Sequence, residues 1–250
     1  MKTLLSLFLG LSAVTNLLAF DTSQSVTATA ITSVPYAITA PGNYYLPHDL
    51  VSTSPGVAIT INANEVTLDL NGRSLIAEGA AESPLVGIGI AVLNHEDVII
   101  QNGDINNFGY LGVLFDATDG RREHNQKNIL RDVNFNGDLV GAEIVSGSID
   151  LVERCDFDGG SVGIYDVATL GGDRFEYDNF ENQTKSEVLA LGVGIVSTPG
   201  KGTLAEFCLF ADDQTAGIID QGTPDRLRFN SFVSNGATHI GGLSLGLADN

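Results

Sequence analysis

A repeated pair of residue columns constrains this chain more than any other feature of its sequence. Bulky apolar residues recur at intervals of 30, 30, 22, 23, 30 and 22 residues. They are Leu75, Ile105, Phe135, Phe157, Phe180, Phe210 and Phe232. The second column is a glycine followed mostly by an apolar residue, at Gly87, Gly112, Gly141, Gly163, Gly194, Gly217 and Gly242. Repeats of about 20 to 50 residues are typical of solenoids.

The shortest intervals indicate a basic coil of 22 or 23 residues, with extra length appearing as loops. Short strands joined by tight turns need such a length to complete one circuit and stack about 4.8 Å from the last. A content of 29 glycines, one methionine and no tryptophan also favours a turn-rich β protein over a helical one. We therefore expect an all-β solenoid in which the rings of one column stack on each other.

A third column, two residues before the bulky one, contains Cys155, Asp178 and Cys208 on successive coils. Two rungs of separation put the cysteine backbones about 9.6 Å apart, whereas a disulfide needs Cα atoms within about 7 Å. The sequence therefore predicts two free, buried thiols. A Cys-Asp-Cys metal site is the alternative, but three ligands in one straight column do not surround an ion.

The N-terminal 19 residues have the pattern of a secretory signal peptide. Lys2 precedes an apolar run, and the segment ends in Leu17, Leu18 and Ala19, which suits a small-residue cleavage site. A signal anchor is the alternative, although the apolar stretch is short and interrupted. We expect a secreted or cell-envelope protein, and no other segment is apolar and long enough to span a membrane.

The chain is strongly acidic, with a formal net charge of -19 that becomes -20 once Lys2 is removed with the signal peptide (-19 minus 1). Such a surface repels nucleic acid and anionic lipid, so neither is expected as a partner. No cofactor is predicted. Calcium stays open, because acidic exported proteins often bind divalent cations, and plain solubility explains the charge as well.

Three stretches carry a resemblance to a known class: 36–46 (YAITAPGNYYL), 58–72 (AITINANEVTLDLNG) and 98–105 (VIIQNGDI). They resemble the single-stranded right-handed parallel β-helix proteins of the pectin lyase-like class. The resemblance implies an N-terminal cap over residues 20–56 and a β-helix domain over 57–250. Because this class includes lyases, hydrolases, epimerases and adhesins, it implies little about activity.

Enzymes of this class act on polysaccharides laid across the outer face of stacked strands, so carboxylates at outward positions are candidate site residues. If the residue after each glycine points inward, the next points outward. Asp116 and Glu143 are then the only carboxylate pair on that face, and Tyr165 lies beside them. A glycosidase needs two carboxyls about 5–9.5 Å apart, and a tyrosine can stack on a sugar. Scattered surface acids are the alternative interpretation.

A second possible site resembles that of polygalacturonases in placement. Asp212 and Asp213 precede an inward strand, and His239 follows on the next coil. The chain lacks the Asn-Thr-Asp of those enzymes one coil earlier and an Arg-Ile-Lys after the histidine. Aspartates in a turn are the alternative. Arg121 and Arg122 lie in a polar insertion, where they would either grip an acidic glycan or pair with the protein's own acids.

Two function classes follow. One is an exported, non-catalytic β-helix that binds a glycan or a surface partner, favoured by the incomplete motifs. The other is a polysaccharide hydrolase or lyase using Asp212, Asp213 and His239. Solvent-facing carboxylates gathered in one place would discriminate between them.

Overall fold

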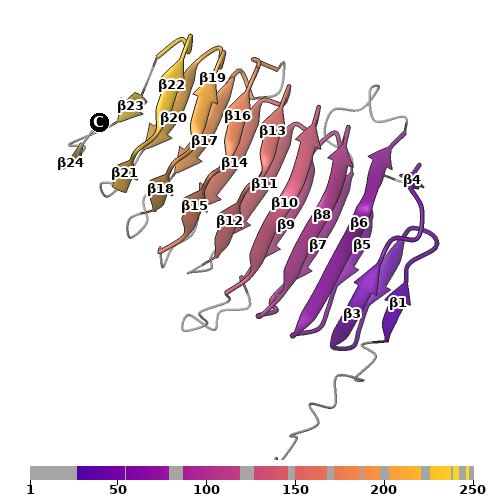
Figure 1. The fold of residues 1–250 in the computed structure, drawn as a ribbon. Coiled ribbons are helices and arrows are strands. Elements are labelled where there is room, and N and C mark those ends of the chain that lie inside the picture. The colour runs from indigo at the N-terminus through magenta and orange to yellow at the C-terminus, as the bar shows by residue number, and fades with distance from the viewer. Residues whose placement is uncertain are drawn as a thin grey trace, which may run out of the picture.

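The computed structural model describes residues 27–53, 55–78, 87–118, 127–145, 150–167, 172–186, 189–197, 203–220, 226–237, 239–241 and 246–247. The predicted signal peptide lies outside these residues. The described chain is all-β without helices, and its coils follow one another in chain order from β1 to β24 (Figure 1). Two all-parallel sheets alternate along the chain, as in a β-solenoid. Within these residues there is no helix long and apolar enough to cross a membrane.

Sheet B contains one strand from each coil and is parallel throughout. Its strands are β2 (Tyr36–Ile38), β5 (Val57–Ile61), β7 (Ile88–Leu93), β9 (Leu111–Asp116), β11 (Val140–Val145), β14 (Val162–Val167), β17 (Val193–Ser197), β20 (Ala216–Asp220) and β23 (His239–Gly241). Buried and partly exposed residues alternate in the second half of β9, β11 and β14, whereas every residue of β17 is buried. One face of this sheet therefore lines the core and the other faces outward.

Sheet A has a main path and a branch. The main path is β1 (Ala28–Ala30), β3 (Gly42–Tyr45), β6 (Val66–Ala77), β8 (Ile99–Asn106), β10 (Ile129–Asn136), β12 (Leu151–Glu153), β15 (Arg174–Glu176), β18 (Leu204–Glu206), β21 (Arg226–Arg228) and β24 (Gly246–Leu247). The branch continues from β10 and consists of β13 (Asp156–Asp158), β16 (Asn179–Glu181), β19 (Leu209–Ala211) and β22 (Ser231–Val233). A separate short strand, β4 (Leu50–Ser52), pairs with β6.

A corner with left-handed backbone separates the main path from the branch. It is occupied by Asn102, Asp132, Arg154, Tyr177, Phe207 and Phe229, with φ between 54° and 63°. Asparagine and aspartate tolerate this conformation, but large side chains adopt it rarely. From β12 onward the long strand is divided at this corner into two short strands.

The phenylalanine column is confirmed as the spine of the core. Rings of Phe135, Phe157, Phe180, Phe210 and Phe232 stack with centroids 4.7–5.0 Å apart. Leu75 and Ile105 continue the column in register toward the N-terminus. Leu75, Ile105 and the first four phenylalanines are at most 2% exposed, so each coil covers the apolar ring of its neighbour.

The glycine column faces the rings, and two of its predicted members were wrong. In the pairing of β7 with β9, Ile88 lies opposite Leu111 and Ile90 lies opposite Val113. Gly89 therefore lies opposite Gly112 and holds the position predicted for Gly87. The last glycine was also misplaced, because His239 pairs with Ile218 and thus holds the register position predicted for Leu243. The final coil is therefore aligned four residues earlier than the sequence pattern indicated.

The two cysteines are free and buried, as predicted. Cys155 and Cys208 are each 2% exposed and lie two coils apart in one column. Burial raises the pKa of both thiols, and the neighbouring Asp178 raises them further. They are apolar filler of the core rather than reactive groups.

Candidate functional site on the outer face of sheet B

Four side chains gather on the outer face of sheet B, where β9, β11 and β14 run side by side. Glu143 on β11 pairs with Leu114 of β9 on one side and with Tyr165 of β14 on the other. Asp116 lies two residues beyond Leu114, and alternation along a strand returns it to the same face. Tyr110 lies just before β9. This brings together the predicted Asp116, Glu143 and Tyr165.

The electrostatics of these groups show that they act on each other. Burial raises the pKa of the Glu143 carboxyl, and the charge of Asp116 raises it further. Burial also raises the pKa of the Tyr110 hydroxyl, as does repulsion from Glu143 and Tyr165. Asp116 is held in a turn, because its Oδ1 accepts a hydrogen bond of 2.9 Å from the Thr118 amide. The raised pKa favours the protonated form of the Glu143 carboxyl.

The surroundings of this cluster are apolar. Leu114, Leu139 and Tyr165 pack against a second hydrophobic cluster on the outside of sheet B, formed by Leu111, Val140, Val162, Val193 and Val196. Leu189 and Leu191 pack on it too. An apolar floor with a few polar groups is the usual composition of a ligand site.

Tyr110 was not predicted from the sequence. It lies in the turn before β9, outside the period-two pattern that marked the other three residues. It is 38% exposed. An aromatic residue directly before a strand of the solenoid was the available signal.

The second predicted trio is placed differently. Asp213 is 1% exposed, and its Oδ1 accepts a hydrogen bond of 3.2 Å from the backbone N–H of Gln183. Asp212 beside it is exposed, with φ 56°. His239 begins β23 opposite the buried Ile218. The carboxyl of Asp213 therefore lies inside the coil, and a catalytic role for the trio stays a prediction. Arg121 and Arg122 lie outside the described residues.

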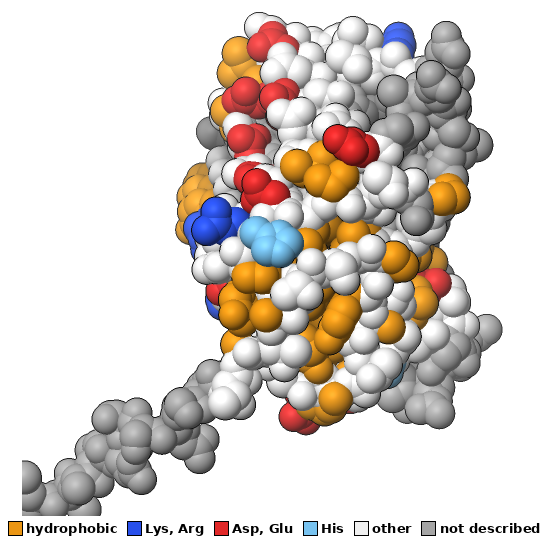
Figure 2. Space-filling model, turned by 90° about the vertical axis from the view of Figure 1, so that its right-hand side faces the viewer, with side chains coloured by type: hydrophobic (Ala, Val, Ile, Leu, Met, Phe, Trp, Pro, Cys, Tyr) orange, Lys and Arg blue, Asp and Glu red, His pale blue; other side chains and the backbone are white. Residues whose placement is uncertain are grey.

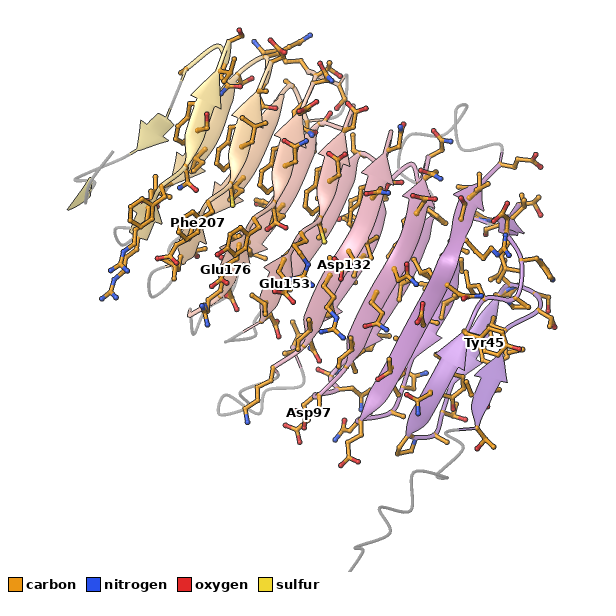
Figure 3. The ribbon with its side chains drawn as sticks, viewed as in Figure 1. Tyr45, Asp97, Asp132, Glu153, Glu176 and Phe207 are labelled. Carbon is orange, nitrogen blue, oxygen red and sulfur yellow. The ribbon has the colours of Figure 1, made fainter. Side chains whose placement is uncertain are left out.

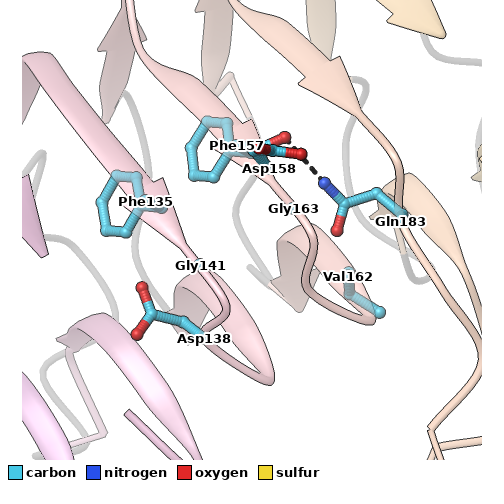
Figure 4. Close-up of a pocket in the computed structure, with 8 residues that line it drawn as sticks. All are labelled: Phe135, Asp138, Gly141, Phe157, Asp158, Val162, Gly163 and Gln183. Carbon is cyan, nitrogen blue, oxygen red and sulfur yellow. Dashed lines mark hydrogen bonds between the residues drawn. The ribbon is translucent and has the colours of Figure 1, made fainter. Parts of the chain in front are cut away.

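A cavity inside the solenoid is too small for a sugar. Its lining is Phe135, Asp138, Gly141, Phe157, Asp158, Val162, Gly163 and Gln183 (Figure 4). Its volume is about 10 Å³, which is the lower limit for a single water molecule. This cavity is therefore not a glycan site.

An exposed ladder of aromatic rings on the sheet A corner is a second surface that sequence reasoning missed. Tyr177, Phe207 and Phe229 are 46–59% exposed, and their centroids are 5.0 Å apart in a parallel stack. The stack covers both faces of the central ring. A sugar that needs a free ring face cannot use Phe207, so this aromatic ladder suits a glycan less well than Tyr165.

Acidic side chains accompany the aromatic ladder. Asp132, Glu153, Glu176 and Phe207 follow each other along one side of the ribbon (Figure 3). Arginines pair with acids beside the aromatic ladder. Arg154 pairs with Asp132 at 2.7 Å, and Arg228 pairs with Glu206 on β18 at 3.3 Å. The charge on one face of the molecule is uneven: Figure 2 shows a line of acidic side chains along its upper left edge and most of the hydrophobic side chains in its lower half.

Among the described residues, no group of three or more His, Cys, Asp or Glu side chains is placed to hold a metal ion. Comparison of the chain with protein-family models and with curated proteins gives no match.

Proposed function

We propose that this protein is an exported, non-catalytic β-helix of the pectin lyase-like type that binds a neutral glycan on the outer face of sheet B. The observation that supports this most directly is the gathering of Tyr110, Tyr165, Asp116 and Glu143 on one apolar stretch of sheet. Tyrosine rings contact the apolar faces of a sugar, and carboxylate oxygens accept hydrogen bonds from its hydroxyls.

The charge of the chain favours a neutral ligand. A uronate would be repelled by Asp116 and by a net charge of -19. Within the described residues, no lysine or arginine interacts with Asp116 or Glu143. A neutral polysaccharide has no such penalty, and its hydroxyls suit both carboxyls.

A polysaccharide-acting enzyme is the second candidate, and the raised pKa of Glu143 beside Asp116 favours it. A glycosidase needs one protonated carboxyl as acid and a second, ionised carboxyl as nucleophile or base. Here Glu143 would donate the proton to the glycosidic oxygen and Asp116 would act as nucleophile or base. This pair has a better surface position than Asp212 and Asp213.

One experiment separates the two candidates. The secreted protein is screened for binding on a glycan array, and the bound glycans are then assayed for reducing ends and unsaturated products. We expect binding to neutral glycans, weak binding to pectate and alginate, and no turnover. Turnover lost in Glu143→Gln would establish the enzyme instead. Binding only to uronates would contradict the proposal.

A further inference from the structure

One column of side chains, buried at three positions and partly buried at the fourth, faces backbone carbonyl groups of the coil before it. Cys155, Asp178, Cys208 and Asn230 hold equivalent positions on four successive coils. The Cys155 thiol lies 3.7 Å from the Leu130 carbonyl oxygen, the Cys208 thiol 3.5 Å from that of Phe175, and the Asn230 amide 3.0 Å from that of Ala205. These three carbonyls are also equivalent in register. Each thiol also lies close to a carbonyl oxygen of its own coil, that of Glu153 at 3.6 Å and that of Glu206 at 3.4 Å. Three of the four side chains are thus placed to donate to the coil before, and the Asn230 side chain does so with normal hydrogen-bond geometry.

Asp178 is the exception, because a carboxylate has no hydrogen to donate. Its side chain is 1% exposed, and its Oδ1 accepts a hydrogen bond of 2.8 Å from the Cys155 amide. Its Oδ2 is buried and has no hydrogen-bond partner among the described residues. The carbonyl in the equivalent register position is that of Val152. An ionised Asp178 would leave an acceptor unpaired in the core, which is costly.

The next turn repeats this arrangement. The side-chain Nε2 of Gln183 donates to the Phe157 carbonyl at 2.8 Å (Figure 4). The side-chain Nδ2 of Asn235 donates to the Phe210 carbonyl at 2.9 Å. Asp213 lies between them in the column, and its Oδ2 is also buried without a partner among the described residues. The equivalent carbonyl for Asp213 is that of Phe180.

We propose that Asp178 and Asp213 are carboxylic acids in the folded protein, and that each donates its proton to the carbonyl of the coil before, Val152 and Phe180 respectively. They then take the place of asparagine or glutamine in the column. Folding therefore takes up protons, and the solenoid is stabilised as the pH falls.

The electrostatic surroundings agree, because all titratable groups that act on these two carboxyls are acids or thiols. They are Glu153, Glu176, Cys155 and Cys208 at Asp178, and Asp212 and Glu181 at Asp213. Burial raises the pKa of Asp178 well above its ordinary value and that of Asp213 to about 8. Burial likewise raises the pKa of Asp138 and Asp150, whose second oxygens are buried without a partner too.

The sign of the pH dependence follows from these directions. A carboxyl whose pKa is higher in the folded than in the unfolded chain stabilises the fold fully below the unfolded value, which is about 3.9. That stability is lost as the pH rises toward the folded pKa. Between about pH 4 and 8, the unfolding constant should thus rise about tenfold per pH unit for each acid that stays protonated.

The test is urea unfolding as a function of pH for the wild type and three variants. Asp178→Asn should leave the unfolding constant nearly unchanged near pH 4, lower it at least tenfold at pH 7, and remove one proton from the pH slope. Asp178→Ala should be less stable than the wild type at pH 4, because both hydrogen bonds are gone. The control is Asp97→Asn, since Asp97 is exposed in a left-handed turn that asparagine tolerates, and it should leave the slope unchanged.

An infrared spectrum at pH 7 reads the protonation directly. The band of protonated carboxylic acids should be present in the wild type and weaker in Asp178→Asn. An Asp178→Asn variant that is equally or less stable at pH 7, or a wild type without this band, would overturn the proposal.

Discussion

Single phenylalanine side chains set the distance and register between neighbouring coils. Phe157 is 1% exposed and stacks between Phe135 at 4.7 Å and Phe180 at 5.0 Å. Each ring thus covers the apolar face of the next, and the stack adds about 0.5–1.5 kcal/mol per pair to the burial of its area. Removing one ring leaves a hole in the middle of the column.

Phe157→Ala should therefore lower the free energy of unfolding by about 3–5 kcal/mol through lost burial and cavity formation. The matched control is the next residue, Asp158→Ala, which removes only a hydrogen bond from Asn182 at the surface and should cost at most about 0.5 kcal/mol. Urea unfolding measures both. Equal costs would contradict the role of the phenylalanine column.

Strands of sheet B depend on glycines because the rings of sheet A approach their backbone. A Cβ atom at Gly163 would lie 2.5 Å from Phe180 Cδ1 and 2.7 Å from the Gly194 carbonyl oxygen. The same close approach recurs between three further glycines and rings: Gly112 with Phe135, Gly141 with Phe157, and Gly194 with Phe210. The glycine and phenylalanine columns are two sides of one packing requirement.

Gly163→Ala should consequently destabilise the fold by about 1–3 kcal/mol, because the methyl group overpacks a ring held from both sides. Gly56→Ala serves as control, since nothing lies within 4 Å of a Cβ there, and it should stay within about 0.5 kcal/mol of the wild type. Thermal unfolding followed by circular dichroism compares them. A tolerated Gly163→Ala would argue against this packing.

The fold could be predicted from the sequence wherever a column leaves one possible alignment. The phenylalanine column left one alignment, because no other large rings at similar intervals could be placed opposite each other on successive coils. The first glycine was misassigned because Gly87-Ile88 and Gly89-Ile90 offer the same pattern two residues apart, and the pairing of whole strands decides between them. Gly242 was misassigned for the same reason, since Gly242-Leu243 matches the sequence pattern but the strand pairing places His239 opposite Ile218.

The candidate site was predicted in part. Period-two alternation placed Asp116, Glu143 and Tyr165 on one face, and the strand register brings them together. Tyr110 and the aromatic ladder were not predicted, because they lie in turns, where the sequence has no periodic pattern. The ladder also breaks the local rule for left-handed residues, which favours asparagine, aspartate and glycine.

On the scale of the whole molecule, the solenoid offers two outward aromatic surfaces of different chemistry. The sheet B site combines Tyr110 and Tyr165 with two carboxyls on an apolar floor. The aromatic ladder of Tyr177, Phe207 and Phe229 presents ring edges beside acids that are already paired with arginines. A neutral glycan should therefore select the first surface.

The most direct measurement of this claim is isothermal titration of a neutral oligosaccharide from the array into the wild type, Tyr165→Ala and Tyr177→Ala. Both variants remove one tyrosine from the outside of the solenoid, and circular dichroism checks that both stay folded. Tyr165→Ala should weaken binding at least about tenfold, as expected for a central aromatic contact, and Tyr177→Ala should bind as the wild type does. Unchanged binding by Tyr165→Ala, with loss in Tyr177→Ala, would contradict the account.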